Sequence, residues 1–227
     1  MDLSQIHHDA KSNGDTWDYL WADDGNLYTF GCGGRGYGRT GQNLNFNRLA
    51  GPAWNELTGS LVNPMEEYGG SGAYLADHSA KLNPRDWAKL PRGPNWKVTG
   101  ADCIDGAIYA FVAENWYGNQ YAYGGKTQDP FLRQTVNNMS LIKSADHGRT
   151  WIRDETANAA RPLWTNKLFS TAFFFKYGQD GGHTTQDAQD KFVYAMSNDG
   201  YWDSGSRFRL GRVARDKIGH LNAADWD

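Results

Sequence analysis

Carboxylates close to aromatic residues are the feature of this 227-residue sequence that could do chemistry. Asp18 follows Trp17, and Glu114 lies just before the pair Trp116-Tyr117. Two carboxylates can cleave a glycosidic bond when they stand ~5–5.5 Å apart for retention, or ~6.5–9.5 Å apart for inversion, and aromatic rings stack on sugars. We therefore predict Asp18 and Glu114 as catalytic, and Trp17, Trp116 and Tyr117 as substrate-binding. Two plainer readings stay open: Asp18 as a solvated turn carboxylate and Glu114 as an exposed loop acid.

Three further acids are candidates for the catalytic or substrate-binding carboxylates. Glu66-Glu67 lie in a glycine-rich stretch, from which Glu66 is predicted to reach substrate. Asp102 falls in the middle of a predicted strand, where an inward carboxylate would need a partner. Whether any two of these acids approach within hydrolase range decides between cleavage and simple binding.

The metal-ligating residue types do not cluster. The six histidines are scattered without an H-x-x-x-H pattern, so no transition-metal site and no cofactor are predicted. A single structural calcium near Gln179-Asp180-Gly181-Gly182 stays open. Cys32 and Cys103 lack a C-x-x-C pattern, and their spacing leaves a disulfide between them open.

Composition narrows the classes of partner. The formal net charge of −3 argues against a nucleic-acid partner, and the short apolar runs argue against a membrane partner. The first eight residues have no basic or apolar region of the kind a signal peptide needs. Ten Trp and 12 Tyr with 27 Gly are typical of short strands and tight turns, with rings available for a glycan.

A repeat runs along the chain. Residues 17–30 align without a gap on residues 98–111, each being a strand, an Asp-Gly turn and a second strand. A looser third copy covers residues 170–177 and 190–196. Further strands are expected at 44–49, 56–62, 139–143, 150–153 and 208–213, with long loops at 63–95, 115–137 and 178–190.

Four strands per unit, radially repeated, predict an all-β fold of the β-propeller type. Residues 1–227 would form one partial propeller domain: blade one at about 16–62, blade two at about 96–154, and an incomplete blade three at about 165–227. Propellers need about four blades or more to close. The sequence therefore predicts a fragment in preference to closure by another chain.

The segment 144–151 carries the most specific motif. Its fixed positions match the pattern S-x-D-x-G-x-T-W of the Asp-box in sialidase-like propellers; they are Ser144, Asp146, Gly148, Thr150 and Trp151. We expect Asp146 to accept hydrogen bonds from turn amides and Gly148 to adopt a positive φ, with Trp151 packed beneath. The predicted role is structural, on the outer hairpin of a blade.

Three stretches together resemble the endo-D-arabinanase-like family: 16–31, 97–151, and 190–218 with the phrase FRLGRVARDKI at its end. This resemblance implies a secreted or periplasmic five-bladed propeller, monomeric when complete, that cleaves furanosidic linkages with retention through two Asp carboxylates in its axial funnel. One of these falls on Asp18. The position of the other is occupied by Cys32, and a thiol cannot replace a carboxylate in that mechanism.

Three hypotheses follow. The first is a glycoside hydrolase acting on furanose-containing glycans. The alternative is a non-catalytic sugar-binding propeller, which the Cys32 position favours and the pair Asp18 and Glu114 opposes. A third is a purely structural interaction module.

Overall fold

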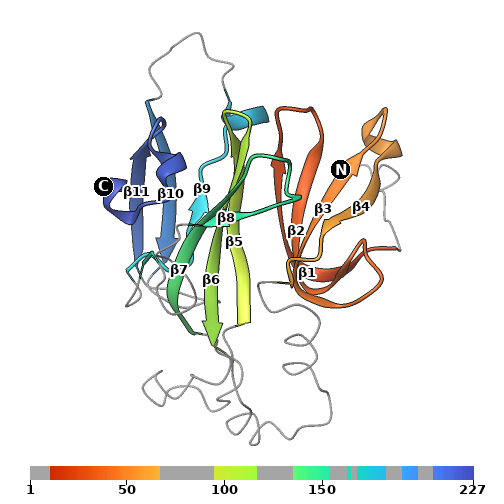
Figure 1. The fold of residues 1–227 in the computed structure, drawn as a ribbon, viewed down its shortest axis with the longest axis horizontal. Coiled ribbons are helices and arrows are strands. Elements are labelled where there is room, and N and C mark those ends of the chain that lie inside the picture. The colour runs from red at the N-terminus through yellow and green to blue at the C-terminus, as the bar shows by residue number, and fades with distance from the viewer. Residues whose placement is uncertain are drawn as a thin grey trace, which may run out of the picture.

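The computed structural model describes residues 11–66, 95–116, 135–153, 163–164, 168–182, 191–198 and 207–227. This part of the chain is all-β, as predicted, and its strands form three antiparallel sheets that follow one another along the chain (Figure 1). No helix in these ranges has the length and apolar character needed to cross a membrane.

Each sheet is an up-and-down meander whose spatial order is its chain order. The first sheet contains β1 (Asn13–Trp21), β2 (Leu27–Gly36), β3 (Gln42–Ala50) and β4 (Thr58–Asn63). The second sheet contains β5 (Asn95–Ile104), β6 (Ala107–Trp116), β7 (Thr135–Ser144) and β8 (Ile152–Arg153). The third contains β9 (Phe173–Phe174), β10 (Phe192–Asn198) and β11 (Phe208–Ala214). Short 3-10 turns lie at Trp54–Glu56, Gln179–Gly181, Ile218–His220 and Ala223–Asp225.

The two Asp-Gly turns lie where the repeat places them. Asp105 and Gly106 join β5 to β6 with φ values of 53° and 74°, which suits a two-residue hairpin turn. In the first sheet the turn is longer: the Ala22 amide donates to the Asn26 carbonyl at 3.0 Å, and the Asp24 carboxylate accepts the Asn26 amide.

The third copy of the repeat departs from its prediction. Within residues 170–177 only Phe173–Phe174 pairs as a strand, because the preceding amides leave the ladder. The amides of Ser170 and Thr171 both donate to the Ser197 hydroxyl, at 3.0 and 3.1 Å. A side chain therefore takes the place of the next ladder hydrogen bonds, and β9 stays two residues long.

The three sheets pack face to face in chain order, and their first strands lie together: β1 packs along β5, and β5 along β9. Two apolar clusters fill the spaces between sheets. The cluster between the first and second sheets includes Leu20, Phe30, Cys32, Phe46, Val98, Cys103, Ile108 and Ile142. The cluster between the second and third includes Ile104, Phe111, Met139, Leu141, Phe169, Phe174, Val193 and Val213. The second sheet is therefore covered on both faces.

Candidate functional site

Asp18 is held where β1 meets β5. One carboxylate oxygen accepts the Ala101 backbone N–H at 2.5 Å, and the other lies 2.7 Å from the Lys176 ammonium. Lys176 follows β9 and also donates to the Tyr19 carbonyl, with its ammonium 4.6 Å from the centre of the Tyr19 ring. The Asp18–Lys176 ion pair thus connects β1 of the first sheet to the segment after β9 of the third sheet. It does so beside β5, the first strand of the second sheet.

Burial raises the pKa of Asp18, and the positive charge of Lys176 together with its hydrogen bond acts against that rise. The ammonium is the group that favours the ionised carboxylate here. Removing Lys176 would leave a partly buried carboxylate with only backbone donors, so its pKa would rise further.

Asp102 is a second acid in the same neighbourhood, one residue beyond Ala101 on β5. Its side chain is almost fully buried, with the residue 3% exposed, and its oxygen accepts the Cys103 amide at 2.9 Å. Burial raises its pKa to about 7; the Cys103 amide and Lys176 oppose the rise, while the negative charge of Asp18 adds to it. The two acids therefore act on each other, and near neutral pH Asp102 exchanges its proton while Asp18 is paired with an ammonium.

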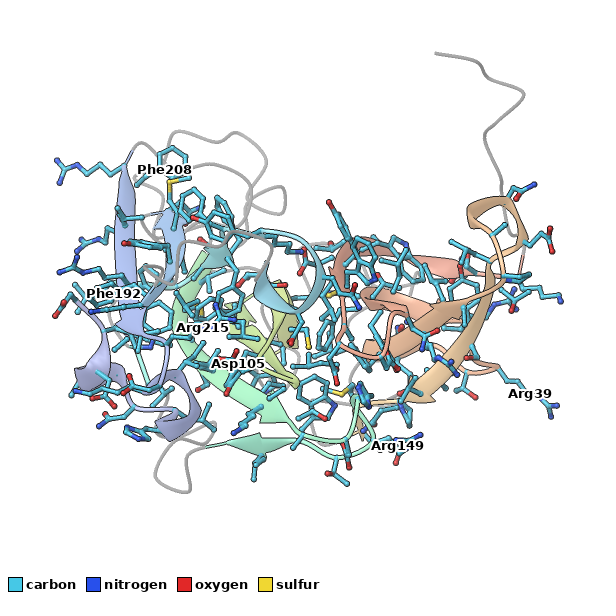
Figure 2. All side chains as sticks on the ribbon, turned by 90° about the horizontal axis from the view of Figure 1, so that it is seen from above. Arg39, Asp105, Arg149, Phe192, Phe208 and Arg215 are labelled. Atoms are coloured by element: carbon cyan, nitrogen blue, oxygen red, sulfur yellow. The ribbon has the colours of Figure 1, made fainter. Side chains whose placement is uncertain are left out.

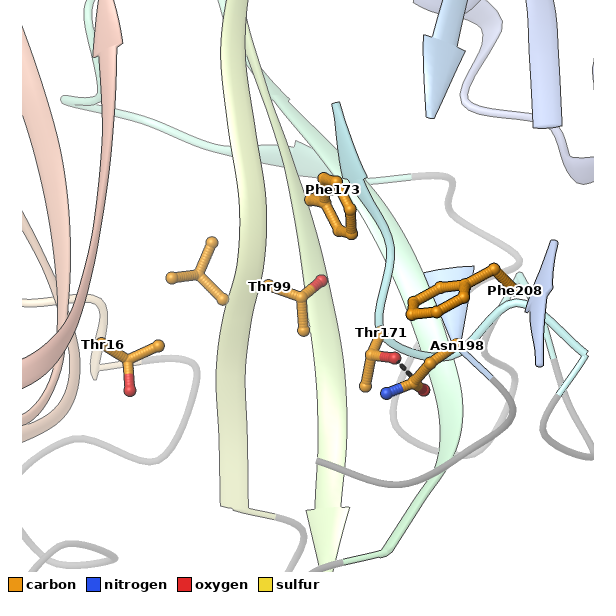
Figure 3. Close-up of a pocket in the computed structure, with 7 residues that line it drawn as sticks. Thr16, Thr99, Thr171, Phe173, Asn198 and Phe208 are labelled. Atoms are coloured by element: carbon orange, nitrogen blue, oxygen red, sulfur yellow. Dashed lines mark hydrogen bonds between the residues drawn. The ribbon is translucent and has the colours of Figure 1, made fainter. Parts of the chain in front are cut away.

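A cavity of about 310 Å³ opens beside these strands, at the level where β1 and β5 begin (Figure 3). Its lining combines three hydroxyl groups, one amide and two aromatic rings with a valine: Thr16, Thr99, Thr171, Asn198, Phe173, Phe208 and Val98. Hydroxyl and amide groups beside rings are able to hold a polar ligand that has apolar faces. No carboxylate is among these described lining residues.

Irregularities in both first strands place two of the threonines at the cavity. On β1, Thr16 and Trp17 together oppose the single residue Gly31, and on β5 Thr99 is an extra residue between the Val98 and Gly100 pairings. Such bulges redirect side chains and are frequent beside functional sites. Thr99 then donates to the Ala172 carbonyl at 2.6 Å, which ties β5 to the segment preceding β9.

Thr16 has a backbone φ of 50°, in the left-handed region. A β-branched residue is strained in that conformation, at a cost of about 1–3 kcal/mol, and such strain gathers at ligand sites. The strain therefore falls on a residue that lines the cavity.

A search against protein-family profiles and curated protein sequences finds no match to this chain. What the site can do therefore follows from its own acids, hydroxyl groups and rings. Within the described ranges, no group of three or more His, Cys, Asp or Glu side chains is arranged to hold a metal ion. Asp180, in the segment considered for calcium, accepts the Gly106 amide at 2.8 Å.

The predicted site residues fall in several places. Asp18 lies two residues along β1 from the cavity-lining Thr16. Trp17 lies apart from the cavity: its indole donates to the Gly14 carbonyl at 3.2 Å, and its ring meets Tyr37 edge-on at 6.1 Å. The cavity rings are instead Phe173 and Phe208, from the third sheet.

The other predicted acids and rings add little to the site. Glu66 is exposed beyond β4. Glu114 and Trp116 lie on β6, with Glu114 paired to Trp96, but their side chains are outside the described part of the chain, as are the whole of Glu67 and Tyr117. Within the described residues, the acid that shares the surroundings of Asp18 is Asp102.

The cysteines do not form the disulfide that their spacing left open. Both thiols are free, although Cys32 and Cys103 are buried in the same apolar cluster. Burial raises the pKa of Cys32 to about 11. The position where the resemblance expects a second acid is therefore a neutral thiol in the core.

Sequence reasoning missed Lys176, Thr99 and Thr171. Lys176 lies in the third copy of the repeat, where the strand prediction gave no reason to single out a cation. A bulge leaves no clear sequence signal, because Thr99 reads as an ordinary strand residue until the pairing of β5 with β6 is known.

The turn at 144–151 connects β7 to β8, and in it Asp146 accepts one turn amide, as predicted, and two hydroxyl groups as well. Asp146 accepts the Thr150 amide at 2.9 Å and the Thr150 hydroxyl at 2.7 Å, and the Ser144 hydroxyl donates to it at 2.8 Å. Trp151 reaches the first sheet, with its ring 5.4 Å from Phe30 and 5.3 Å from Phe46. The turn therefore fastens the second sheet to the first and lies outside the cavity.

We expect Asp146→Ala to lower the free energy of unfolding by about 1–2 kcal/mol at pH 7, because three hydrogen bonds to the turn are lost. Burial slightly opposes ionisation, but the Thr150 and Ser144 hydrogen bonds prevail and lower the pKa of Asp146. The contribution is thus complete above about pH 4 and is lost as the pH falls further. Urea unfolding at pH 7 and pH 2.5 measures both values; an equal loss at the two pH values would contradict the assignment. Asp146→Asn, which keeps one acceptor oxygen, is the milder control.

Proposed function

We propose that this chain forms about three blades of a β-propeller that binds a glycan in the cavity beside the first strands of its sheets. The arrangement of the sheets supports the propeller proposal. The three meanders follow one another in chain order and pack face to face, with β5 lying between β1 and β9. Successive propeller blades have this relation. The S-x-D-x-G-x-T-W turn and the family resemblance point to the carbohydrate-active members of this fold.

The observation that carries the proposal is the lining of the cavity. Thr16, Thr99, Thr171 and Asn198 line it with hydroxyl and amide groups, and Phe208 presents a ring that is 65% exposed. The Thr171 hydroxyl donates to the Asn198 side-chain oxygen (Figure 3), and the Thr171 oxygen is an acceptor that a ligand can use. Sugar hydroxyls both donate and accept hydrogen bonds, and the C–H faces of a sugar ring stack on aromatic rings. A neutral furanose or pyranose unit therefore fits this lining better than an anion or a purely apolar ligand.

Phe208→Ala is expected to weaken glycan binding about tenfold or more while leaving the folded state in place, because the ring is exposed and stacks on the ligand. Leu210→Ala is the matched control: Leu210 lies on the same strand, is also 65% exposed, and is not among the cavity-lining residues. Titration calorimetry with furanosidic and pyranosidic oligosaccharides measures both affinities. If no member of a broad panel binds, the carbohydrate assignment is wrong; equal losses in the two variants would place the glycan elsewhere.

Hydrolysis is a second candidate, favoured by the pair Asp18 and Asp102. Burial raises the pKa of Asp102 to about 7, and the Asp18 carboxyl is paired with the Lys176 ammonium; glycoside hydrolysis needs one acid with a raised pKa and one carboxylate. In this assignment Asp102 would be the general acid and Asp18 the carboxylate opposite it. The burial of Asp102 stands against it, since a substrate would have to reach a side chain that is nearly closed to solvent.

Release of reducing ends separates the two candidates. Turnover that is abolished in Asp18→Asn and in Asp102→Asn, with binding retained, would make the protein a hydrolase. Binding without turnover would make it a sugar-binding propeller.

A further inference from the structure

A second cavity, of about 470 Å³, lies between the first sheet and the 144–151 turn of the second. Its polar walls are formed by Asp24, Tyr28, Arg48, Ser60, His147 and Arg149. It is separate from the site above: none of these residues lines the first cavity or contacts Asp18. Figure 2 shows Arg149 where this turn approaches the first sheet.

Two guanidinium groups reach this cavity from different sheets. Arg48 belongs to β3, and Arg149 to the turn, where one of its nitrogens donates to the Asp146 carbonyl at 3.1 Å. Burial raises the pKa of the Tyr28 hydroxyl, and the positive charges of Arg48 and Arg149 both oppose that rise. Both guanidinium groups therefore lie near Tyr28, which is part of the cavity lining. Within the described residues, neither guanidinium is within ion-pair distance of a carboxylate.

The acids near the cavity are already engaged. Asp24 accepts hydrogen bonds from the Asn26 amide, the Asn26 side chain and the Tyr28 hydroxyl, at 3.0, 2.8 and 2.8 Å. Asp23 lies 2.9 Å from the His147 ring nitrogen, and that ring is stacked on Tyr28 with 5.9 Å between centres. The acids thus hold the His147 and Tyr28 rings in place, and both arginines line the cavity without a carboxylate partner among the described residues.

We propose that this cavity binds a tetrahedral oxyanion, phosphate or sulfate, between Arg48 and Arg149, with the Ser60 hydroxyl as a further donor. Guanidinium groups suit oxyanions because their planar N–H donors pair with two oxygens at once. Donors arriving from two sheets and a hydroxyl approach the ligand from separate directions, which a tetrahedral anion satisfies better than a flat carboxylate. The anion can be free in solution or carried as an ester on a larger ligand.

Binding the anion would also join the two sheets. Arg48 is on the first sheet and Arg149 is in the turn of the second. A ligand held by both would link the sheets on the side where the Asn63 side-chain amide already donates to the Arg149 carbonyl at 3.0 Å. A ligand that binds only the folded arrangement raises stability by mass action. We therefore expect phosphate or sulfate to raise the melting temperature, and chloride at equal ionic strength to do so less.

The test is calorimetric titration of the protein with sodium phosphate and with sodium sulfate at constant ionic strength. We expect saturable binding that weakens about tenfold or more in Arg48→Gln and again in Arg149→Gln. The matched control is Arg39→Gln, because Arg39 is exposed, lies outside the cavity lining and points away from the molecule in Figure 2. Absence of saturable binding, or equal affinity in Arg48→Gln and the parent protein, would overturn the proposal.

Arg48→Gln is the decisive variant, since no hydrogen bond or ion pair of the described residues depends on the Arg48 side chain, whereas Arg149 also supports its turn.

The affinities of glucose 6-phosphate, glucose and inorganic phosphate, measured side by side, distinguish a free anion from one carried on a sugar. Tighter binding of the ester than of inorganic phosphate would support a sugar-borne group, and equal binding would support the free anion. Binding of glucose 6-phosphate that Arg48→Gln leaves unchanged would count against this cavity. Because the readout is oxyanion binding, it succeeds or fails independently of neutral-glycan binding at the first cavity.

Discussion

Asp102→Asn is expected to make the folded protein more stable at pH 8, by about 2–4 kcal/mol, and to change its stability little at pH 4. The folded protein holds the Asp102 proton with a pKa of about 7, against 3.8 for the unperturbed group, because burial opposes the charged form. Each tenfold difference in proton affinity corresponds to about 1.4 kcal/mol. Among the acids in the described part of the chain, Asp102 therefore has the largest predicted influence on the pH dependence of folding.

The sign follows from which state binds the proton more tightly. Because the pKa is raised on folding, the stability contributed by this carboxyl is complete below about pH 4 and is lost as the pH rises through about 7. Asparagine resembles the protonated carboxyl, since its oxygen can still accept the Cys103 amide, and it has no charge to bury. The substitution should therefore flatten the pH profile between about pH 4 and pH 7.

Guanidinium unfolding measured from pH 4 to pH 8 tests this expectation. Asp216→Asn is the control, since Asp216 is exposed on the turn after β11 and its replacement should shift the curve by less than about 0.5 kcal/mol at every pH. A difference between Asp102→Asn and the parent that stays constant across this range would show that Asp102 keeps an ordinary pKa. The hydrolytic candidate would then lose its general acid.

Much of the strand order could be predicted from the sequence because hairpins are local. Alternating apolar residues around Asp24-Gly25 and Asp105-Gly106 are sufficient to place β1, β2, β5 and β6. The short β9 could not be predicted, because its ladder ends where the Ser197 hydroxyl, 27 residues away from Ser170, takes the backbone amides. Contacts of that range leave no trace in local alternation.

The candidate site was predictable only in part for the same reason. Asp18 stands out in the sequence because it follows Trp17 and falls on an acidic position of the resembling family, but its partner Lys176 is 158 residues away. The sequence also gives no means of knowing that the strand pairing shifts at Thr16 and Thr99, and this shift decides which side chains reach the cavity. Chemistry built between sheets is visible only once the sheets are placed against each other.

Gly148→Ala is expected to destabilise the protein by about 3 kcal/mol or more, through the contact between the first and second sheets. Gly148 has a φ of 85°, and a Cβ added there would lie 2.1 Å from two ring carbons of Phe46. Phe46 is fully buried and packs against Tyr28, Phe30 and Trp151. The ring therefore has no free space to move into, and well-packed cores tolerate such overlap poorly.

The loss expected for Gly148→Ala has two parts, the strain of a positive φ and the overlap with Phe46, and Gly25→Ala measures the first part alone. Gly25 has a similar φ of 80°, but a Cβ there would have nothing within 4 Å. Its replacement should thus cost only the backbone strain, about 1 kcal/mol. Urea unfolding of the two variants measures the difference, which we expect to be about 2 kcal/mol or more. Equal losses would mean that the tip of the 144–151 turn does not press on Phe46.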